Sequence, residues 1–184
     1  MYLITTEEWG NFAWNKLYKK SLFKNIRYPV SKNYEDIYTT FKLINKAKSF
    51  ATYNKSLYLY RIRNGSITNT NNVTKALRNN INSLEAREQQ LSFFMDNNYV
   101  RAYNNAHYYY ICECFVHIDL IIKNKLKKDS RYYKCLSAIG KANNIFNFSN
   151  INKIGFNFWI KQKICIYFPN IYAVLIKVKN KIKK

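Results

Sequence analysis

Two adjacent carboxylates, Glu35 and Asp36, are the residues of this sequence best suited to acid–base chemistry. They follow the segment 32–34, Lys-Asn-Tyr, and come before a run of apolar residues with helical spacing. Acidic side chains in a first helical turn interact favourably with the positive end of the helix dipole, which would keep a carboxylate ionised at neutral pH. An ionised carboxylate can act as a general base toward a hydroxyl group. The alternative is that both acids only stabilise the start of a helix.

Two arginines, Arg61 and Arg63, form a second candidate group. They are two positions apart in a segment with strand-like composition, and alternate residues of a strand point to the same face. Two guanidinium groups on one face can bind a diphosphate or a carboxylate. A solvated strand face explains the same residues equally well.

Common catalytic and metal-binding motifs are absent from the sequence. With only four glycines it has no glycine-rich phosphate loop, and it lacks Gly-x-Ser-x-Gly and His-Glu-x-x-His. Cys112 and Cys114 are two apart in a helix-like segment, so they would not share a helix face. No two aspartates are close in sequence; they are Asp36, Asp96, Asp119 and Asp129. We therefore predict no metal site in this chain.

The elements around the two candidate groups are predicted to include both strands and helices. Three segments, 12–18, 50–53 and 56–62, are rich in aromatic and aliphatic residues, which is typical of strands. From Glu35 the apolar side chains repeat at helical spacing instead, at Ile37, Tyr38, Phe41, Ile44 and Ala47. The sequence Thr5-Thr-Glu-Glu8 has capping-box spacing and predicts a short helix just after Thr5. The predicted fold class is α+β, mostly helical by residue count.

The region 69–150 has helical periodicity. One predicted helix carries an apolar face at Val73, Leu77, Ile81, Leu84, Leu91 and Met95. A second runs from about Arg101 to Leu126, and a third follows the N-cap candidates Asp129 and Ser130 and ends near Gly140. Apolar faces of this kind indicate core packing rather than a cofactor site.

The final segment, 151–184, combines apolar and basic residues. Its apolar run, 164–176, is shorter than the roughly 18 residues that a spanning helix needs, and Pro169 interrupts it. Trp159, tyrosines and flanking lysines favour a segment that lies in the headgroup interface of a membrane. The alternative is a helix packed on the domain with a solvated lysine end. The lysines are Lys161, Lys163, Lys177, Lys179, Lys181, Lys183 and Lys184.

The charge of the chain indicates an anionic partner. It has 184 residues, with 31 Lys and Arg against 10 Asp and Glu, and a net charge of +21. Nucleic acid, an acidic lipid surface or phosphorylated substrates would all suit this charge, although a coding bias toward Asn, Lys, Ile and Tyr also contributes to it. The N-terminus has no cationic run typical of a secretory signal, so we expect a cytoplasmic protein, peripheral at the inner face of the cell membrane.

Residues 13–68 resemble the second half of the family 2 glycosyltransferase domain, the inverting GT-A enzymes that build bacterial surface polysaccharides. Four blocks carry the resemblance in order: Ala13-Trp-Asn-Lys-Leu-Tyr-Lys-Lys20, Ile26-Arg-Tyr-Pro29, Tyr34-Glu-Asp36 with its following helix, and Leu57-Tyr-Leu-Tyr-Arg-Ile-Arg-Asn-Gly-Ser-Ile-Thr68. The resemblance implies the acceptor-side half of a GT-A-like α/β domain with a few strands. It divides the chain into this remnant (1–68), a helical region (69–150) and a basic amphipathic tail (151–184).

The resemblance also implies a reaction and roles for individual residues. An acceptor hydroxyl would attack the anomeric carbon of a nucleotide sugar with inversion, and Asp36 would take the hydroxyl proton while Glu35 shapes the acceptor pocket. Trp14, Asn15 and Lys16 would line the floor beneath donor and acceptor. Arg61 and Arg63 would contact the leaving diphosphate.

The resemblance does not include the nucleotide-binding half of the family, whose metal-binding Asp-x-Asp has no counterpart in this sequence. The complete enzyme would use a divalent ion, Mn²⁺ or Mg²⁺, with a nucleotide-sugar donor and a glycan or lipid-linked acceptor. We therefore expect a truncated or split form that is inactive or nearly so alone. The alternative function is a non-catalytic basic protein that binds nucleic acid or an anionic membrane surface.

Overall fold

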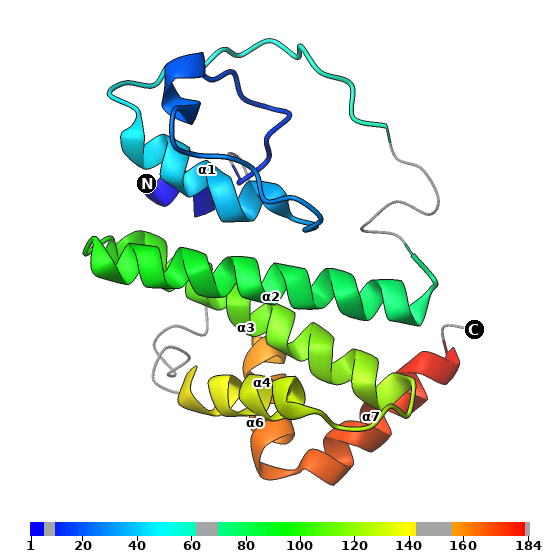
Figure 1. Cartoon of the computed structure of the whole chain (residues 1–184). Helices are drawn as coiled ribbons and strands as arrows, with labels where there is room; N and C mark the ends of the chain where they lie inside the picture. The colour runs from blue at the N-terminus through cyan, green and yellow to red at the C-terminus, as the bar shows by residue number, and fades with distance from the viewer. Residues whose placement is uncertain (6–9, 62–69, 143–155, 183–184) are drawn as a thin grey trace. The chain divides into compact units, whose positions relative to one another are not determined.

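The computed structural model describes residues 1–5, 10–61, 70–142 and 156–182, and all regular secondary structure in them is helical. Two short 3-10 turns, η1 (Tyr2–Thr5) and η2 (Lys20–Phe23), are followed by helix α1 (Glu35–Lys46). The further helices, shown in Figure 1, are α2 (Val73–Asp96), α3 (Val100–Lys123), α4 (Ser130–Lys141), α6 (Phe156–Tyr167) and α7 (Pro169–Ile182).

The predicted α+β fold class is wrong, because the described residues contain no strand. The segments 12–18, 50–53 and 56–61 have no regular secondary structure, and Ile62 lies outside the described residues. Strand formation requires pairing of backbone groups with a neighbouring strand, and composition alone does not supply that neighbour. Every residue from 48 to 61 is exposed in this structure. A strand-containing GT-A-like α/β domain is therefore not what this part of the chain forms.

The helix predictions are confirmed. Helix α1 begins at Glu35 with both carboxylates in its first turn, and α2, α3 and α4 match the three predicted helices of the region 69–150. Asn72 caps α2 by accepting a hydrogen bond from the backbone N–H of Lys75 at 2.9 Å. Asp129 caps α4 in the same way, through the N–H of Tyr132 at 2.7 Å. The helix predicted just after Thr5 falls on residues 6–9, outside the described residues.

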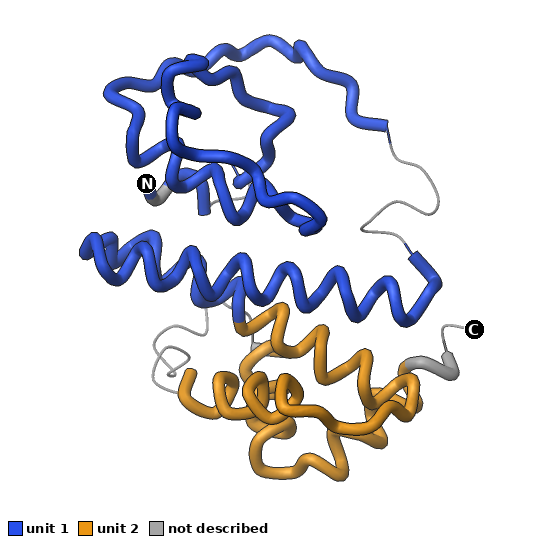
Figure 2. The backbone as a smooth tube through the Cα atoms, in the orientation of Figure 1, with its two compact units in different colours: residues 1–110 blue, residues 111–184 orange. Residues whose placement is uncertain are grey.

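The chain divides into two compact units, residues 1–110 and residues 111–184, coloured separately in Figure 2. The predicted division into a glycosyltransferase remnant (1–68), a helical region (69–150) and a basic tail (151–184) stays a prediction.

In unit 1, helix α1 packs on α2. Phe41 of α1 is fully buried, and its ring centroid lies 4.8 Å from that of Phe93 and 5.9 Å from that of Phe94. The hydroxyl of Tyr38 donates a hydrogen bond to the backbone carbonyl of Asn82 at 3.1 Å. Aromatic burial and this buried hydrogen bond fix α1 against α2, so the first turn of α1 has a defined position.

In unit 2, the part of α3 after Ile111 shares a core with α4, α6 and α7. Phe115, Ile118 and Ile139 are buried there. Gln162 of α6, itself buried, donates a hydrogen bond to the backbone carbonyl of Ile139 at 2.9 Å. None of the helices in the described part of the chain is long and apolar enough to cross a membrane.

Candidate functional site

The candidate site of unit 1 is built around Asp36 in the first turn of α1. Asp36 accepts a hydrogen bond from the backbone N–H of Ile37 at 2.8 Å, and the same N–H also donates to the carbonyl of Tyr34 at 3.0 Å. Tyr34, the residue before α1, has left-handed backbone angles (φ 61°, ψ 35°), and it packs against the buried cluster of Ile37, Tyr38 and Ala86. A bulky residue rarely adopts this conformation, and such strain gathers at functional sites. Packing of Tyr34 holds the backbone there.

The environment of Asp36 disfavours its charged form. Burial raises the pKa of the Asp36 carboxyl above its ordinary value, and the neighbouring charge of Glu35 raises it further. The hydrogen bond from Ile37 and the charge of Arg87 on α2 act in the opposite direction. Desolvation therefore dominates, and a carboxylate with a raised pKa is a better proton acceptor than an ordinary aspartate.

Two tyrosines share the environment of Asp36. Burial raises the pKa of Tyr18 to about 12, and the charge of Asp36 contributes to that shift. Burial and the charges of Asp36 and Glu35 also raise the pKa of Tyr28. Both phenols are consequently neutral hydrogen-bonding groups at physiological pH.

Lys16 is the cation that the loop 10–16 places near Asp36. Its Nζ donates hydrogen bonds to the backbone carbonyls of Gly10 and Phe12, each at 3.0 Å, and to Oδ1 of Asn15 at 2.7 Å. Burial lowers the pKa of Lys16 to about 8, although the charge of Asp36 opposes this shift. Lys16 thus closes its own loop and supplies a positive charge at the site.

A series of buried polar contacts connects α2, this loop and α1. Arg87 donates a hydrogen bond to Oε1 of Gln90 at 2.9 Å, and Gln90 donates to Oδ1 of Asn11 at 3.0 Å. The hydroxyl of Thr40 on α1 donates to the backbone carbonyl of Asn11 at 2.7 Å. Gln90 and Thr40 are fully buried. Buried networks of this kind are rigid because each unpaired group would cost free energy.

Trp14 lies in an exposed group of aromatic rings, stacked on Phe12 and Tyr58 and tilted against Tyr60. Its ring centroid is 5.2 Å from that of Phe12, 5.1 Å from that of Tyr58 and 5.3 Å from that of Tyr60. Trp14 remains 42% exposed. An exposed aromatic face of this type can receive an apolar or carbohydrate surface.

The structure brings some of the predicted site residues together and leaves others apart. Asp36, Glu35 and Lys16 share one electrostatic environment, and Asn15 joins it by accepting a hydrogen bond from Lys16. Arg61 is exposed, and Arg87, not Arg61, is the arginine whose charge acts on Asp36. Arg63 lies outside the described residues. The assigned roles of these residues stay predictions.

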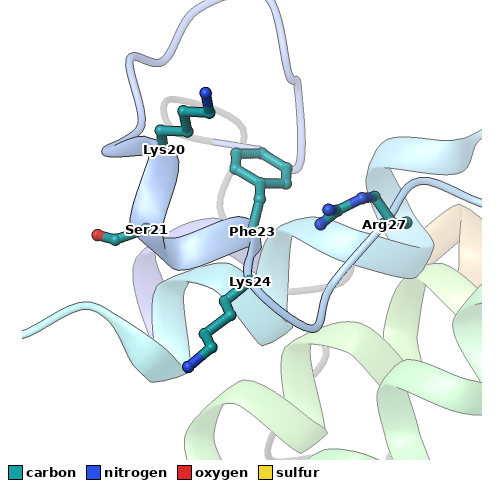
Figure 3. Close-up of a pocket in the computed structure, with 5 residues that line it drawn as sticks. All are labelled: Lys20, Ser21, Phe23, Lys24 and Arg27. Carbon is teal, nitrogen blue, oxygen red and sulfur yellow. The ribbon is translucent and has the colours of Figure 1, made fainter.

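A hollow of about 550 Å³ at η2 has none of the predicted site residues in its lining. Lys20, Ser21, Phe23, Lys24 and Arg27 line it. In Figure 3 the guanidinium of Arg27 points toward the ring of Phe23, whereas the side chain of Lys24 points away from it. The hollow is cationic, but it was not predicted and no role follows from its lining alone.

The described residues offer no set of ligands for a divalent ion. No three His, Cys, Asp or Glu side chains of the described ranges lie close enough together to hold a metal. Glu35 and Asp36 form a pair of carboxylates only. The ion expected for a complete nucleotide-sugar enzyme therefore does not fit this part of the chain.

Comparison with known proteins gives one partial match. Over 70 residues the chain is 41% identical to Glycosyltransferase GlyA of Streptococcus pneumoniae serotype 4 (strain ATCC BAA-334 / TIGR4). The chain is similar to a glycosyltransferase. The match covers 36% of this chain and only 10% of the length of that relative. No protein-family model and no solved structure matches the chain.

This match confirms the predicted resemblance at the level of a glycosyltransferase. Membership of family 2, the donor, the acceptor and the stereochemistry stay predictions. Because the match covers only 10% of the relative, the activity of that protein can only be proposed for this chain.

Sequence reasoning missed several residues around Asp36: Asn11, Tyr18, Tyr28, Arg87 and Gln90. One signal was available. Arg87 falls between Leu84 and Leu91 at i+3 and i+7 spacing, so a charged side chain occupies the inward face of α2. A charge on an otherwise apolar helix face indicates a buried partner. The tyrosines and Asn11 gave no such signal.

Proposed function

We propose that this chain is the acceptor-side part of a glycosyltransferase of the inverting family 2 type, acting in cell-surface polysaccharide biosynthesis. The likeness to Glycosyltransferase GlyA supports the transferase class. The observation that carries the proposal is the place of Asp36, partly buried in the first turn of α1 beside the exposed Glu35, where burial raises the pKa of its carboxyl. A general base works best when its pKa lies close to the operating pH.

In the proposed reaction a hydroxyl oxygen of the acceptor attacks the anomeric carbon of the nucleotide sugar. The bond between that carbon and the diphosphate oxygen breaks, the diphosphate leaves with the electron pair, and Asp36 takes the hydroxyl proton. A single displacement of this kind inverts the anomeric centre. Glu35, exposed next to Asp36, would contact the acceptor and help shape its pocket.

The neighbouring residues have supporting roles in this proposal. Lys16 and Asn15 would hold the loop beside the acceptor, and the positive charge of Lys16 would favour the approach of anionic substrate groups. Trp14 and its stacked partners would receive the apolar face of a sugar ring. Arg61 and Arg63 would contact the leaving diphosphate, a role that the family resemblance implies and that their guanidinium groups suit.

No step of this proposal uses a metal ion bound by the described residues, because they supply no ligand set. Neutralisation of the diphosphate by Mn²⁺ or Mg²⁺, if the reaction needs it, requires ligands from elsewhere in the complete enzyme. The present chain then supplies the acceptor site and the base, and we expect its transfer activity alone to be close to background.

Acceptor binding tests the proposal directly. The full chain, fluorescently labelled, is applied to an array of glycans and lipid-linked saccharides. We expect saturable binding to a subset, weakened about tenfold by Trp14→Ala because a stacking face is lost. Tyr53→Ala, which removes an exposed ring outside the Trp14 stack, is the matched control and should bind like the wild type. Absence of saccharide binding, or equal losses in both variants, would overturn the acceptor-side role.

A further inference from the structure

The outer face of α7 is apolar although it is exposed. Ile171, Val174, Leu175 and Val178 are 53%, 58%, 49% and 48% exposed. Their positions follow the i, i+3, i+4, i+7 pattern of a single helix face. Tyr167, the last residue of α6, and Phe168, which links α6 to α7, are also exposed. An exposed apolar stripe of this length is unusual on the surface of a soluble protein and marks an interaction surface.

The opposite face of α7 is fixed inside unit 2. Tyr172 and Ile176 are buried, and the Tyr172 hydroxyl donates a 2.5 Å hydrogen bond to Oδ1 of Asp119 on α3. The other carboxylate oxygen of Asp119 accepts from Lys161 of α6 at 3.2 Å. Because this inner face is both apolar and hydrogen-bonded, α7 cannot rotate its outer stripe into the core without losing these contacts.

The charges around the stripe all have one sign. Residues 156–182 contain no Asp or Glu. Lys177 and Lys179 are exposed, and at about 100° per residue they fall on either side of the stripe. Lys163 belongs to α6, and its Nζ lies 5.7 Å from the ring centroids of Trp159 and Tyr167. The partner of this face must therefore offer apolar surface bordered by negative charge.

We propose that the outer face of α7 binds an anionic lipid bilayer, with the helix lying in the plane of the headgroups. Its aliphatic side chains would enter the boundary between headgroups and acyl chains, while the flanking lysines contact lipid phosphates. Nucleic acid fits less well, because exposed aliphatic side chains gain nothing from a phosphate backbone. The sequence predicted membrane contact for the whole segment 151–184. The present proposal is narrower: it places the contact on one face of α7, because Tyr172 and Ile176 on the other face are buried in the core. This inference does not depend on the proposed transferase activity.

Vesicle sedimentation of the full chain tests this assignment. We expect binding to vesicles of phosphatidylglycerol and phosphatidylcholine at least about tenfold tighter than to phosphatidylcholine alone. The double substitution Val174→Glu with Leu175→Glu should weaken binding at least about tenfold, since it places two negative charges in the stripe. The substitutions Lys177→Gln and Lys179→Gln should each weaken it about fivefold, and less at high salt.

The matched control is Val100→Glu, which adds a negative charge at an exposed valine of α3 in unit 1 (65% exposed) and should bind vesicles like the wild type. Circular dichroism establishes that each variant keeps its helix content. Two results would overturn the proposal: unchanged vesicle binding of the folded double variant, or salt-dependent binding of the wild type to random duplex DNA with none to anionic vesicles. Loss of vesicle binding in the double variant with saccharide binding retained would support the lipid surface and leave the acceptor site intact.

Discussion

The side-chain amide of Gln90 donates a hydrogen bond to Oδ1 of Asn11 at 3.0 Å, and it joins helix α2 to the loop that carries Lys16. Gln90 also accepts a hydrogen bond from Arg87, whose charge acts on Asp36. One buried amide of α2 therefore holds the loop and also bonds the arginine whose charge acts on the start of α1.

Gln90→Leu should destabilise the protein by about 2 kcal/mol, because it breaks two buried hydrogen bonds and leaves polar atoms of Arg87 and Asn11 without this partner. Urea denaturation of the purified chain measures the change. Gln89→Leu, at an exposed position one residue earlier, is the control and should remain within about 0.5 kcal/mol of the wild type. Equal effects of the two substitutions would show that the buried contacts contribute nothing specific.

Asp36→Asn should make the folded chain more stable at pH 7. Folding raises the pKa of Asp36, so the folded state holds its proton more tightly and the free energy of unfolding falls as pH rises through the window between the unfolded and folded pKa values. Above that window the charged carboxylate carries the full penalty, which Asn removes. Thermal unfolding at pH 7 and at about pH 4, near the ordinary aspartate pKa, measures the effect, which should shrink at the lower pH.

Glu35→Gln serves as the comparison for this experiment, because Glu35 is exposed and should change the unfolding temperature less. A lower unfolding temperature for Asp36→Asn at pH 7 would mean that the carboxylate is stabilised, not penalised, in the folded state. If the complete enzyme is assembled, the same substitution should leave donor binding intact and abolish transfer.

Lys16 should give the chain a distinct dependence on alkaline pH. Folding lowers the pKa of Lys16 from its ordinary 10.5 to about 8, so the folded state binds fewer protons than the unfolded state between these values. Its contribution to the free energy of unfolding therefore rises with pH across that window. In urea denaturation, the free energy of unfolding of the wild type minus that of Lys16→Met should therefore rise from pH 8 to pH 10. Lys19→Met, at an exposed lysine, controls for the loss of one positive charge. If the free energy of unfolding depends on pH in the same way in both variants, the lowered pKa of Lys16 is contradicted.

In unit 2, Tyr172→Phe should cost about 2 kcal/mol, because a hydrogen bond to a charged, partly buried carboxylate is stronger than an average one. Burial and the charge of Asp119 raise the pKa of Tyr172, so its hydroxyl stays a donor over the whole physiological range. Tyr133→Phe removes a hydroxyl from an exposed tyrosine of α4 and should change stability by less than about 0.5 kcal/mol. Chemical denaturation of the two variants side by side decides whether the Asp119 contact stabilises α7.

The sequence by itself determined the helices and the nearest neighbours of the candidate base. The spacing of Ile37, Phe41 and Ile44 placed α1 correctly, and Asp129 marked the start of α4, because helical hydrogen bonds and caps are made between residues close in the chain. Glu35 and Asp36 lie in the first turn of α1, as the sequence predicted.

The tertiary structure decided whatever depends on a distant partner. Strand-like residues near 50–61 remained without regular structure, since a strand needs another strand beside it and composition cannot supply one. Arg87 came to Asp36, and Gln90 to Asn11, only through the tertiary packing of α2 against α1 and the loop 10–16. The sequence did not indicate which face of α7 is buried, and the tertiary structure places Tyr172 on that face, where its hydroxyl donates to Asp119 of α3. Burial and charge shift pKa values through space, and the linear order of residues does not contain those distances.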